Sequence, residues 1–375
     1  MSPLPYALTL SLAYLGFTQM LVRGLGRIGR GRSRHIPTAV VIVAAHNERG
    51  RIPSLLHALS RQTYDSTRWE IVVADDRSTD GTAEFVEAHA SDLPVACRVL
   101  RVDHCPQGIS PKKNAIAQSI AITQSELVVT TDADCRPEPE WLARMVAEFG
   151  PSTGIVCGFS PILGADGEQG FLRGFQWLDS LSLATTVAGL TGWNIPLTAT
   201  ARSFAYRRQA FEATGGFGES MRVASGDDDL LLHRILARTQ WQVGYTAGSE
   251  ALVPTDPAPR WRDLITARVR HASKIRHYPI RAKAIGGFLL IVNLTAAVAL
   301  GATLSGNGNG AGLLFLGMKL GCDFLALNAG RRRLGAGGSL RWLPLTFIFH
   351  PFYVIGVGLA GLRARYHWKG RAYRP

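Results

Sequence analysis

Two aspartates separated by one residue follow a run of apolar and β-branched residues in VVTTDADC, residues 128–135. Side chains two positions apart in an extended chain point to the same face, so Asp132 and Asp134 should project side by side from a strand end. Adjacent carboxylates repel each other unless a cation lies between them. Mg²⁺ and Mn²⁺ take carboxylate oxygens and keep positions for water or substrate phosphates. The pair is a candidate metal site, and the alternative is a polar turn, since aspartate is a favoured turn residue.

The segments that must position these aspartates alternate between strand and helix. Strand-like runs occupy residues 39–45, 69–76, 95–102 and 126–134. After the first run, Ile52, Leu55, Leu56 and Leu59 have the spacing of one helix face, and helical segments also follow the second and third runs. This alternation predicts an α/β domain whose mostly parallel sheet is flanked by helices.

Polar clusters follow three of these predicted strands. His46-Asn47-Glu48 follows the first, Asp75-Asp76 the second, and the Asp132 and Asp134 pair the fourth. In open parallel sheets ligands bind beyond the carboxyl ends of the strands, so three clusters there predict one shared ligand site. The first strand is not followed by a G-x-G-x-x-G motif, which disfavours a dinucleotide site.

Four apolar runs approach the length that crosses a bilayer, namely residues 4–22, 284–304, 311–330 and 342–362. The first run has no Lys or Arg before it, which favours a retained anchor over a signal peptide. It is followed by a basic cluster of Arg23, Arg27, Arg30, Arg32 and Arg34. By the positive-inside rule, this cluster places the large middle region in the cytoplasm.

The chain of 375 residues carries a formal net charge of +13. This charge predicts attraction to an anionic membrane leaflet. Nucleic acid is not an expected partner, because the arginines concentrate beside apolar runs. The five cysteines are odd in number and form no C-x-x-C pair, so neither a zinc ribbon nor a disulfide framework is expected.

Five motifs in order resemble those of the family 2 glycosyltransferases of GT-A fold, in the membrane-anchored branch with a cytosolic domain. They are AAHNE at 44–48, VVADDRSTDGT at 72–82, SPKKNAI at 110–116, TDAD at 131–134 and SGDDDLLLHRI at 225–235. The motifs span residues 44–235, and their order and spacing make the resemblance specific. It implies inverting transfer of a sugar from a nucleotide-sugar donor, usually a UDP-sugar, to a hydroxyl group.

The resemblance also implies roles for individual residues. Donor contacts fall on Ala44, His46, Glu48, Asp75, Asp76, Lys112, Lys113 and Asp132. Glu48 and the Asp75-Asp76 pair would hold the uracil and ribose, with Lys112 or Lys113 assisting. Asp132 and Asp134 would hold Mn²⁺ or Mg²⁺, with Asp134 as the direct ligand. A metal bridging two phosphates neutralises charge as the nucleoside diphosphate leaves.

The acidic triplet at 227–229 is the predicted catalytic segment. Within the motif, Asp228 corresponds to the general base and Asp227 to the acid before it. A base is required because the acceptor hydroxyl must lose its proton as it attacks the anomeric carbon. The alternative is that the acids favour a helix N-terminus through the macrodipole, and both roles are compatible.

The sequence departs from processive relatives in ARVRHASK, residues 267–274, where those enzymes carry Q-x-x-R-W. Ala267 and His271 replace the glutamine and the tryptophan, which disfavours processive synthesis. Phosphate or acceptor contacts are predicted for Arg268, Arg270, His271 and Lys274, and the alternative is that these cations meet lipid headgroups. Residues 170–193 are either an interfacial helix that feeds a lipid acceptor to the site or ordinary core.

The predicted layout has four parts: an anchor and basic segment at 1–34, a GT-A domain at 35–250, an interfacial segment at 251–283, and a membrane region with a basic tail at 284–375. The last run either is a third C-terminal span, which would put the tail outside, or is broken at His350-Pro351 into a re-entrant or interfacial segment. The predicted function is single sugar transfer to a membrane lipid or lipid-linked acceptor. The alternatives are a processive polysaccharide synthase and an inactive scaffold that binds nucleotide sugar.

Overall fold

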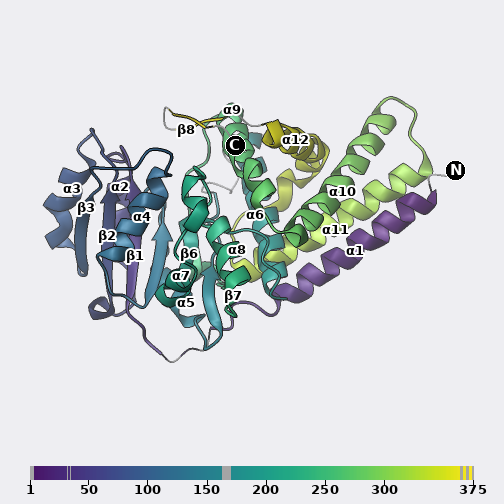
Figure 1. The fold of residues 1–375 in the computed structure, drawn as a ribbon. Helices are drawn as coiled ribbons and strands as arrows, with labels where there is room; N and C mark the ends of the chain where they lie inside the picture. The colour runs from purple at the N-terminus through teal and green to yellow at the C-terminus, as the bar shows by residue number, and fades with distance from the viewer. Residues whose placement is uncertain are drawn as a thin grey trace.

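The computed structural model describes residues 4–31, 33, 35–162, 170–363, 366–368 and 371–373. Arg32 and Arg34 of the predicted basic cluster lie outside the described residues. Figure 1 shows a sheet domain joined to a bundle of long helices, with the N-terminus at the far end of the bundle and the C-terminus near the junction.

A seven-stranded sheet forms the centre of the first part, in the order β3-β2-β1-β4-β6-β5-β7. The strands are β1 (Ala39–Ala45), β2 (Trp69–Asp75), β3 (Ala96–Arg101), β4 (Leu127–Thr131), β5 (Thr153–Cys157), β6 (Phe204–Arg207) and β7 (Gln242–Tyr245). Strands β1 to β4 pair in parallel, β5 and β7 also pair in parallel, and β6 runs antiparallel to both neighbours. The predicted mostly parallel sheet is confirmed.

Helices cover both faces of this sheet. On one face α2 (Ile52–Ser60), α3 (Thr82–His89) and α5 (Trp141–Ala147) share a hydrophobic core with Val41 and Val43 of β1. On the other face α4 (Pro111–Ala121), α6 (Phe171–Thr191), α7 (Arg208–Ala213) and α8 (Asp229–Arg238) pack against Val40 and Ile42. Because alternate side chains of a strand point to opposite faces, a continuous apolar run such as β1 supplies both cores.

Three long helices form the bundle: α1 (Leu4–Leu25), α10 (Ile280–Leu304) and α11 (Gly310–Leu334). The α1 helix is tied to α10 by a Tyr6–Thr295 hydrogen bond of 2.9 Å and to α11 by a Tyr14–Asp323 hydrogen bond of 2.6 Å. By length and composition, the helices able to cross a membrane within the described ranges are Ile280–Leu304, Gly310–Leu334 and Leu340–Leu362. The expected first span is not among them, although α1 packs alongside two that are.

The last apolar run forms one helix, α12 (Leu343–Arg363), which continues through Pro351. Of the two alternatives for this run, the break at His350-Pro351 is therefore wrong. Both ends of the run contact the sheet domain's own helices: Trp342 packs against Gly174 of α6, and Gly361 packs against Ala272 of α9 (Trp261–Ala272). The short strands β8 (Tyr366–Trp368) and β9 (Arg371–Tyr373) follow beside α9, as Figure 1 shows.

Candidate functional site

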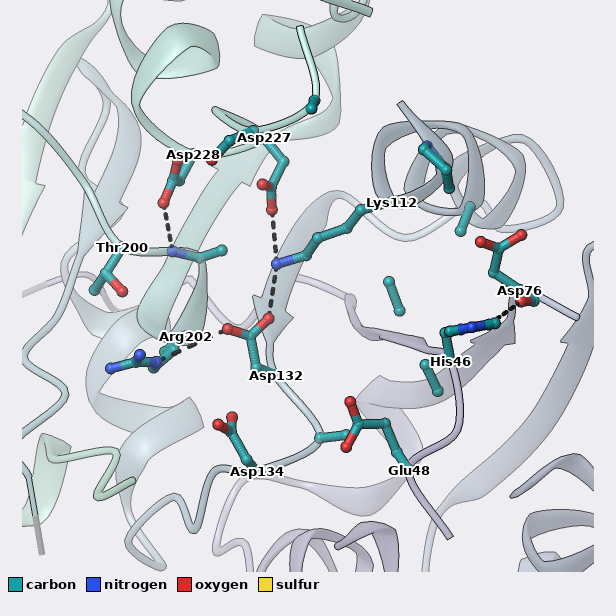
Figure 2. A pocket seen from close by; sticks show the side chains of 18 of the residues that line it. His46, Glu48, Asp76, Lys112, Asp132, Asp134, Thr200, Arg202, Asp227 and Asp228 are labelled. Atoms are coloured by element: carbon teal, nitrogen blue, oxygen red, sulfur yellow. Dashed lines mark hydrogen bonds and ion pairs between the residues drawn. The ribbon is translucent and has the colours of Figure 1, made fainter. Parts of the chain in front are cut away.

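A cavity of about 320 Å³ opens where the carboxyl ends of β1, β2 and β4 meet the N-termini of α4 and α8. The predicted residues that line it are Ala44, His46, Glu48, Asp76, Lys112, Asp132, Asp134, Asp227, Asp228, Arg270 and His271. Figure 2 shows Lys112 extending between Asp132 and Asp227, with Asp134 and Glu48 on the other side of the space. Residues far apart in the sequence thus share one site, because parallel strands end at the same sheet edge.

Four predicted residues do not line this cavity. Asp75 is buried and accepts a hydrogen bond of 3.2 Å from the Ser78 amide. Lys113 is also buried and donates to three backbone carbonyls, those of Ser220 (2.5 Å), Ser225 (3.0 Å) and Val223 (3.1 Å). Its burial lowers its pKa to about 8. Lys113 therefore holds the segment that leads into the acidic triplet, and its side chain does not line the cavity.

Arg268 and Lys274 on the predicted interfacial segment are also engaged elsewhere. The Arg268 guanidinium lies 2.5 Å from the Asp179 carboxylate on α6. The Lys274 ammonium lies 2.5 Å from Asp229 and 3.6 Å from Asp228. Lys274 is buried and Arg268 is half-buried, and both cations are engaged in ion pairs within the protein.

The cavity contains residues that the sequence did not single out, chiefly Arg51, Thr200, Arg202 and Ser225. Arg202 lies just before β6, and its Nε atom is 3.9 Å from the Asp132 carboxylate. Arg51 opens α2 and pairs with Glu48 at 3.1 Å. Arg202 belongs to the stretch ARSFAYRR at 201–208, which leads into β6, and no motif in the sequence distinguished it.

Lys112 links the two acidic motifs of the site. Its Nζ atom lies 2.7 Å from Oδ1 of Asp132 and 3.0 Å from Oδ2 of Asp227, as Figure 2 shows. Burial alone would raise the pKa of Asp132, but the charges of Lys112 and Arg202 outweigh burial and hold it below its ordinary value. Burial alone would lower the pKa of Lys112, but the carboxylates of Asp132 and Asp227 outweigh burial and raise it above its ordinary value. Both groups stay ionised at neutral pH.

Asp134 lies across the cavity from this lysine, and its carboxylate makes no ion pair with the described residues. The cavity is lined by six carboxylates, those of Glu48, Asp76, Asp132, Asp134, Asp227 and Asp228, and by four cations, those of Arg51, Lys112, Arg202 and Arg270. This excess of negative charge opposes a diphosphate unless a cation accompanies it. No group of three or more metal-ligating side chains is preformed among the described residues. One or two carboxylates plus substrate phosphates suffice for Mg²⁺, so the residues fit such an ion.

Asp228 is held rigidly at the start of α8. Oδ1 accepts a hydrogen bond of 2.7 Å from the Asp229 amide, and Oδ2 accepts one of 2.9 Å from the Ala201 amide. Burial raises the pKa of Asp228, and the ammonium of Lys274 opposes that shift. The carboxylate still lines the cavity and keeps lone pairs for a third hydrogen bond. It therefore both caps the helix and presents a proton acceptor.

Arg270 and His271 reach the cavity from α9. His271 is exposed, but the protein atoms around its ring and the nearby cations, Lys274 and Arg270 foremost, lower its pKa below its ordinary value. His271 is therefore neutral at physiological pH. On the opposite side, His46 Nδ1 lies 2.7 Å from the Asp76 carbonyl oxygen, and Glu48 faces the cavity beside it.

Comparison with known proteins defines the class of this fold and site. Residues 40–215 match the family described as glycosyl transferase family 2, so the chain contains a region similar to these enzymes. A solved structure with the same fold is a mannosyltransferase from Pyrobaculum calidifontis in complex with GDP-mannose and Mn²⁺. It is 20% identical with a TM-score of 0.57, over 95% of this chain and 97% of that one.

Curated relatives match over shorter regions. A β-monoglucosyldiacylglycerol synthase from Nostoc is 30% identical over 148 residues, which are 37% of this chain and 31% of the relative. The glycosyltransferase AglE from Haloferax volcanii is 28% identical over 120 residues, which are 32% of this chain and 38% of the relative. The chain thus spans well under half the length of these relatives.

Proposed function

We propose that the protein transfers one sugar from a nucleotide sugar, expected to be a UDP-sugar, to a hydroxyl of a membrane lipid or lipid-linked acceptor, with inversion at the anomeric carbon. The observation that carries this proposal is that Asp228 and the Asp132 and Asp134 pair line the same cavity. The acceptor oxygen forms the new bond to the anomeric carbon as the bond to the diphosphate oxygen breaks. The hydroxyl proton passes to the Asp228 carboxylate, and the nucleoside diphosphate leaves.

The donor side of the cavity suits a nucleoside diphosphate. His46, Glu48 and Asp76 are polar groups for the base and ribose, while Lys112, Arg202 and Arg270 are cations for the phosphates. Asp134, with Asp132, would hold Mn²⁺ or Mg²⁺. When bound, such an ion supplies positive charge that stabilises the leaving diphosphate. Lys112 keeps Asp132 ionised and fixed in orientation while the donor binds.

A lipid acceptor is supported by the helices that flank the site. Three described helices are long and apolar enough to cross a membrane. One relative is named as a β-monoglucosyldiacylglycerol synthase, and another as an undecaprenyl-phosphate 4-deoxy-4-formamido-L-arabinose transferase. We propose that α1, α10 and α11 cross the membrane together, whereas α12 lies at its surface because both of its ends contact the sheet domain.

In this arrangement the sheet domain and the C-terminus lie on one side, which we assign to the cytoplasm from the arginines after α1. Cys105 is a half-buried thiol suited to testing the assignment. A membrane-impermeant maleimide should label Cys105 in inverted vesicles and not in intact cells. Labelling in intact cells would place the domain outside.

The activity itself is tested by incubating the purified protein with a panel of nucleotide sugars, a lipid extract and Mn²⁺, and by identifying mass-shifted lipids. A preparation carrying Asp134→Asn and Asp228→Asn together is the matched control. We expect a glycolipid with a single added sugar and the opposite anomeric configuration to the donor. A polymer indicates a processive synthase, and donor binding without any product indicates an inactive scaffold. Either result contradicts the proposal.

A further inference from the structure

A second cavity lies between α6 and α9, next to the donor cavity. Its volume is about 160 Å³, and it shares Thr200, Arg202 and His271 with the donor cavity. We call it the α6–α9 cavity. Because the two spaces meet at these residues, a molecule in the α6–α9 cavity has its end directed toward the space that Asp228 lines.

Most of the lining of the α6–α9 cavity is apolar, including Phe159, Ile162, Leu183, Ala184, Val187 and Leu264. Three larger polar side chains in the wall are engaged: the Gln176 amide exchanges two hydrogen bonds of 3.0 and 2.8 Å with the Ala258 backbone, Arg268 pairs with Asp179, and Asp256 pairs with Arg136. Two others, Arg202 and His271, lie where this cavity meets the donor cavity. A cavity of roughly 150 Å³ can hold a molecule the size of benzene. This space therefore suits a short hydrocarbon segment.

Unlike the engaged polar side chains of the wall, Ser160 has a hydroxyl group without a hydrogen-bond partner in the described structure. The residue is 6% exposed, and its hydroxyl is buried. A buried hydroxyl without a partner is unfavourable, so such a group in a cavity wall indicates a ligand that completes it. The ligand should therefore carry an oxygen close to its hydrocarbon chain, as an ester or ether lipid does.

The surroundings of the cavity suit a membrane surface. Next to it on α9, Trp261 and Ile265 are 39% and 42% exposed, and Leu183 of the cavity wall on α6 is 42% exposed. Phe171 contacts Trp342 and Phe349 of the α12 region, with ring centroids 5.7 and 5.5 Å apart. Exposed apolar side chains together with clustered aromatic rings are typical of protein surfaces at the edge of a bilayer.

The two departures from Q-x-x-R-W also fall in this cavity. Ala267 and His271 occupy the positions of the glutamine and the tryptophan, and both line the α6–α9 cavity. The small side chain at 267 leaves space that a glutamine would fill. The same substitutions that disfavour a polysaccharide chain thus open the wall to an apolar ligand.

We propose that the α6–α9 cavity binds the hydrocarbon segment next to the hydroxyl-bearing head of the acceptor lipid, with Ser160 bonding an oxygen of that head. The inference rests on the proposed function and assigns its acceptor site. The lipid enters from the bilayer between α6 and α9, and its hydroxyl extends past Thr200 and His271 to Asp228. The rest of the hydrocarbon chain stays in the membrane, since the cavity is too small to hold it.

The test uses a diacylglycerol with a photoreactive diazirine in one acyl chain, presented to the full-length protein in phosphatidylcholine nanodiscs. Irradiation followed by peptide mapping should place the label on α6 and α9 segments that line the cavity. Ala267→Trp fills the cavity and should reduce this label at least about tenfold, the effect of losing roughly 1.4 kcal/mol of binding. Thr266→Trp, at the exposed neighbouring position, should not reduce it. Equal label in the two variants overturns the inference.

Ser160→Ala is a second variant that keeps the fold. Because the serine hydroxyl has no partner in the structure, its removal should not lower the melting temperature. The KM for the lipid acceptor should rise about three- to tenfold, the loss of one hydrogen bond. An unchanged KM overturns the role of Ser160. If the wild type takes up the label at the α6–α9 cavity but transfers sugar to no lipid, the proposed function fails and the cavity assignment stands.

Discussion

The Lys112 ammonium lies 2.7 Å from the Asp132 carboxylate, so the first acid of the D-x-D motif is ion-paired in the protein itself. The same ammonium also contacts Asp227, the acid next to the proposed base. Lys112 therefore couples the donor side of the cavity to the catalytic segment. Because the position of this ammonium is already fixed, a donor diphosphate that binds it does not have to immobilise a flexible lysine side chain, and less conformational entropy is lost on binding.

Lys112→Met should weaken donor binding strongly. The variant removes a cation from a cavity in which acids already outnumber cations and leaves Asp132 and Asp227 facing each other. We expect the nucleoside diphosphate Kd to rise about ten- to a hundredfold, within the cost of a lost charge-assisted contact. Isothermal titration calorimetry measures this, and a Kd within twofold of wild type would contradict the assignment.

Lys113→Met is the matched neighbour, and its effect should differ in kind. Lys113 donates to the carbonyls of Ser220, Val223 and Ser225, so its loss leaves buried acceptors without partners. We expect a melting temperature several degrees lower, from a loss of about 2–4 kcal/mol. If Lys113→Met lost donor affinity with full thermal stability, the structural role given to Lys113 would be wrong.

Removal of the metal ligand is a separate test. Asp134→Asn keeps the size of the side chain and removes the charge from the D-x-D acid that pairs with no described cation. We expect loss of Mn²⁺- or Mg²⁺-dependent donor turnover by about a hundredfold or more. A second measurement, besides turnover, is the binding of Mn²⁺ in the presence of the nucleoside diphosphate, which is monitored by electron paramagnetic resonance and should be weakened in the variant. Full wild-type activity in excess chelator would rule out the metal.

The sequence predicts the first half of this fold well, because β1, β2 and β4 are runs of apolar and β-branched residues followed by polar clusters. The strands β5, β6 and β7 were not predicted. They are four or five residues long, and the antiparallel direction of β6 is set by its pairing with β4 and β5. Such short strands are fixed by their neighbours in the sheet more than by their own composition.

Within the site, the motifs identified which segments meet but not which side chains face the cavity. Lys112 and Lys113 are adjacent at the start of α4, where successive side chains point in different directions, and only the packed helix shows which one reaches Asp132. The composition of α12 is that of a membrane span. Its place beside the sheet domain depends on contacts such as those of Gly361 with Ala272, which no local pattern encodes.

The attachment of α1 to the sheet domain depends on glycines at a helix crossing. A Cβ atom added to Gly24 of α1 would lie 1.9 Å from the Gly189 carbonyl oxygen of α6. Gly24→Ala should therefore lower the free energy of unfolding by about 1–3 kcal/mol. Gly16→Ala, in the same helix, has nothing within 4 Å of the added atom and should be neutral or slightly stabilising. Thermal unfolding in detergent compares them, and equal melting temperatures would show that the two helices do not approach so closely.

If Asp228 is the base, its substitution should slow the transfer step without weakening donor binding. The donor binds before any acceptor proton moves, so Asp228→Asn should leave the donor Kd within a few-fold while transfer falls by about a hundred- to ten-thousand-fold. Asparagine also caps helices well, so α8 should keep its start. Normal transfer by this variant, with loss of activity in Asp227→Asn, would move the role to the neighbouring acid.

The pH dependence gives a second view of the same carboxylate. Burial raises the pKa of Asp228, so transfer should be lost, as the pH falls, at a higher pH than an ordinary aspartate would give. Lys274 lowers that pKa from 3.6 Å away, and Lys274→Met should therefore shift the acid limb of kcat/KM to still higher pH. Lys274→Arg keeps the charge and should restore the limb, whereas Lys283→Met, at an exposed position on α10, should not move it. An acid limb that is the same in Lys274→Met and wild type would mean that the titrating group is not Asp228.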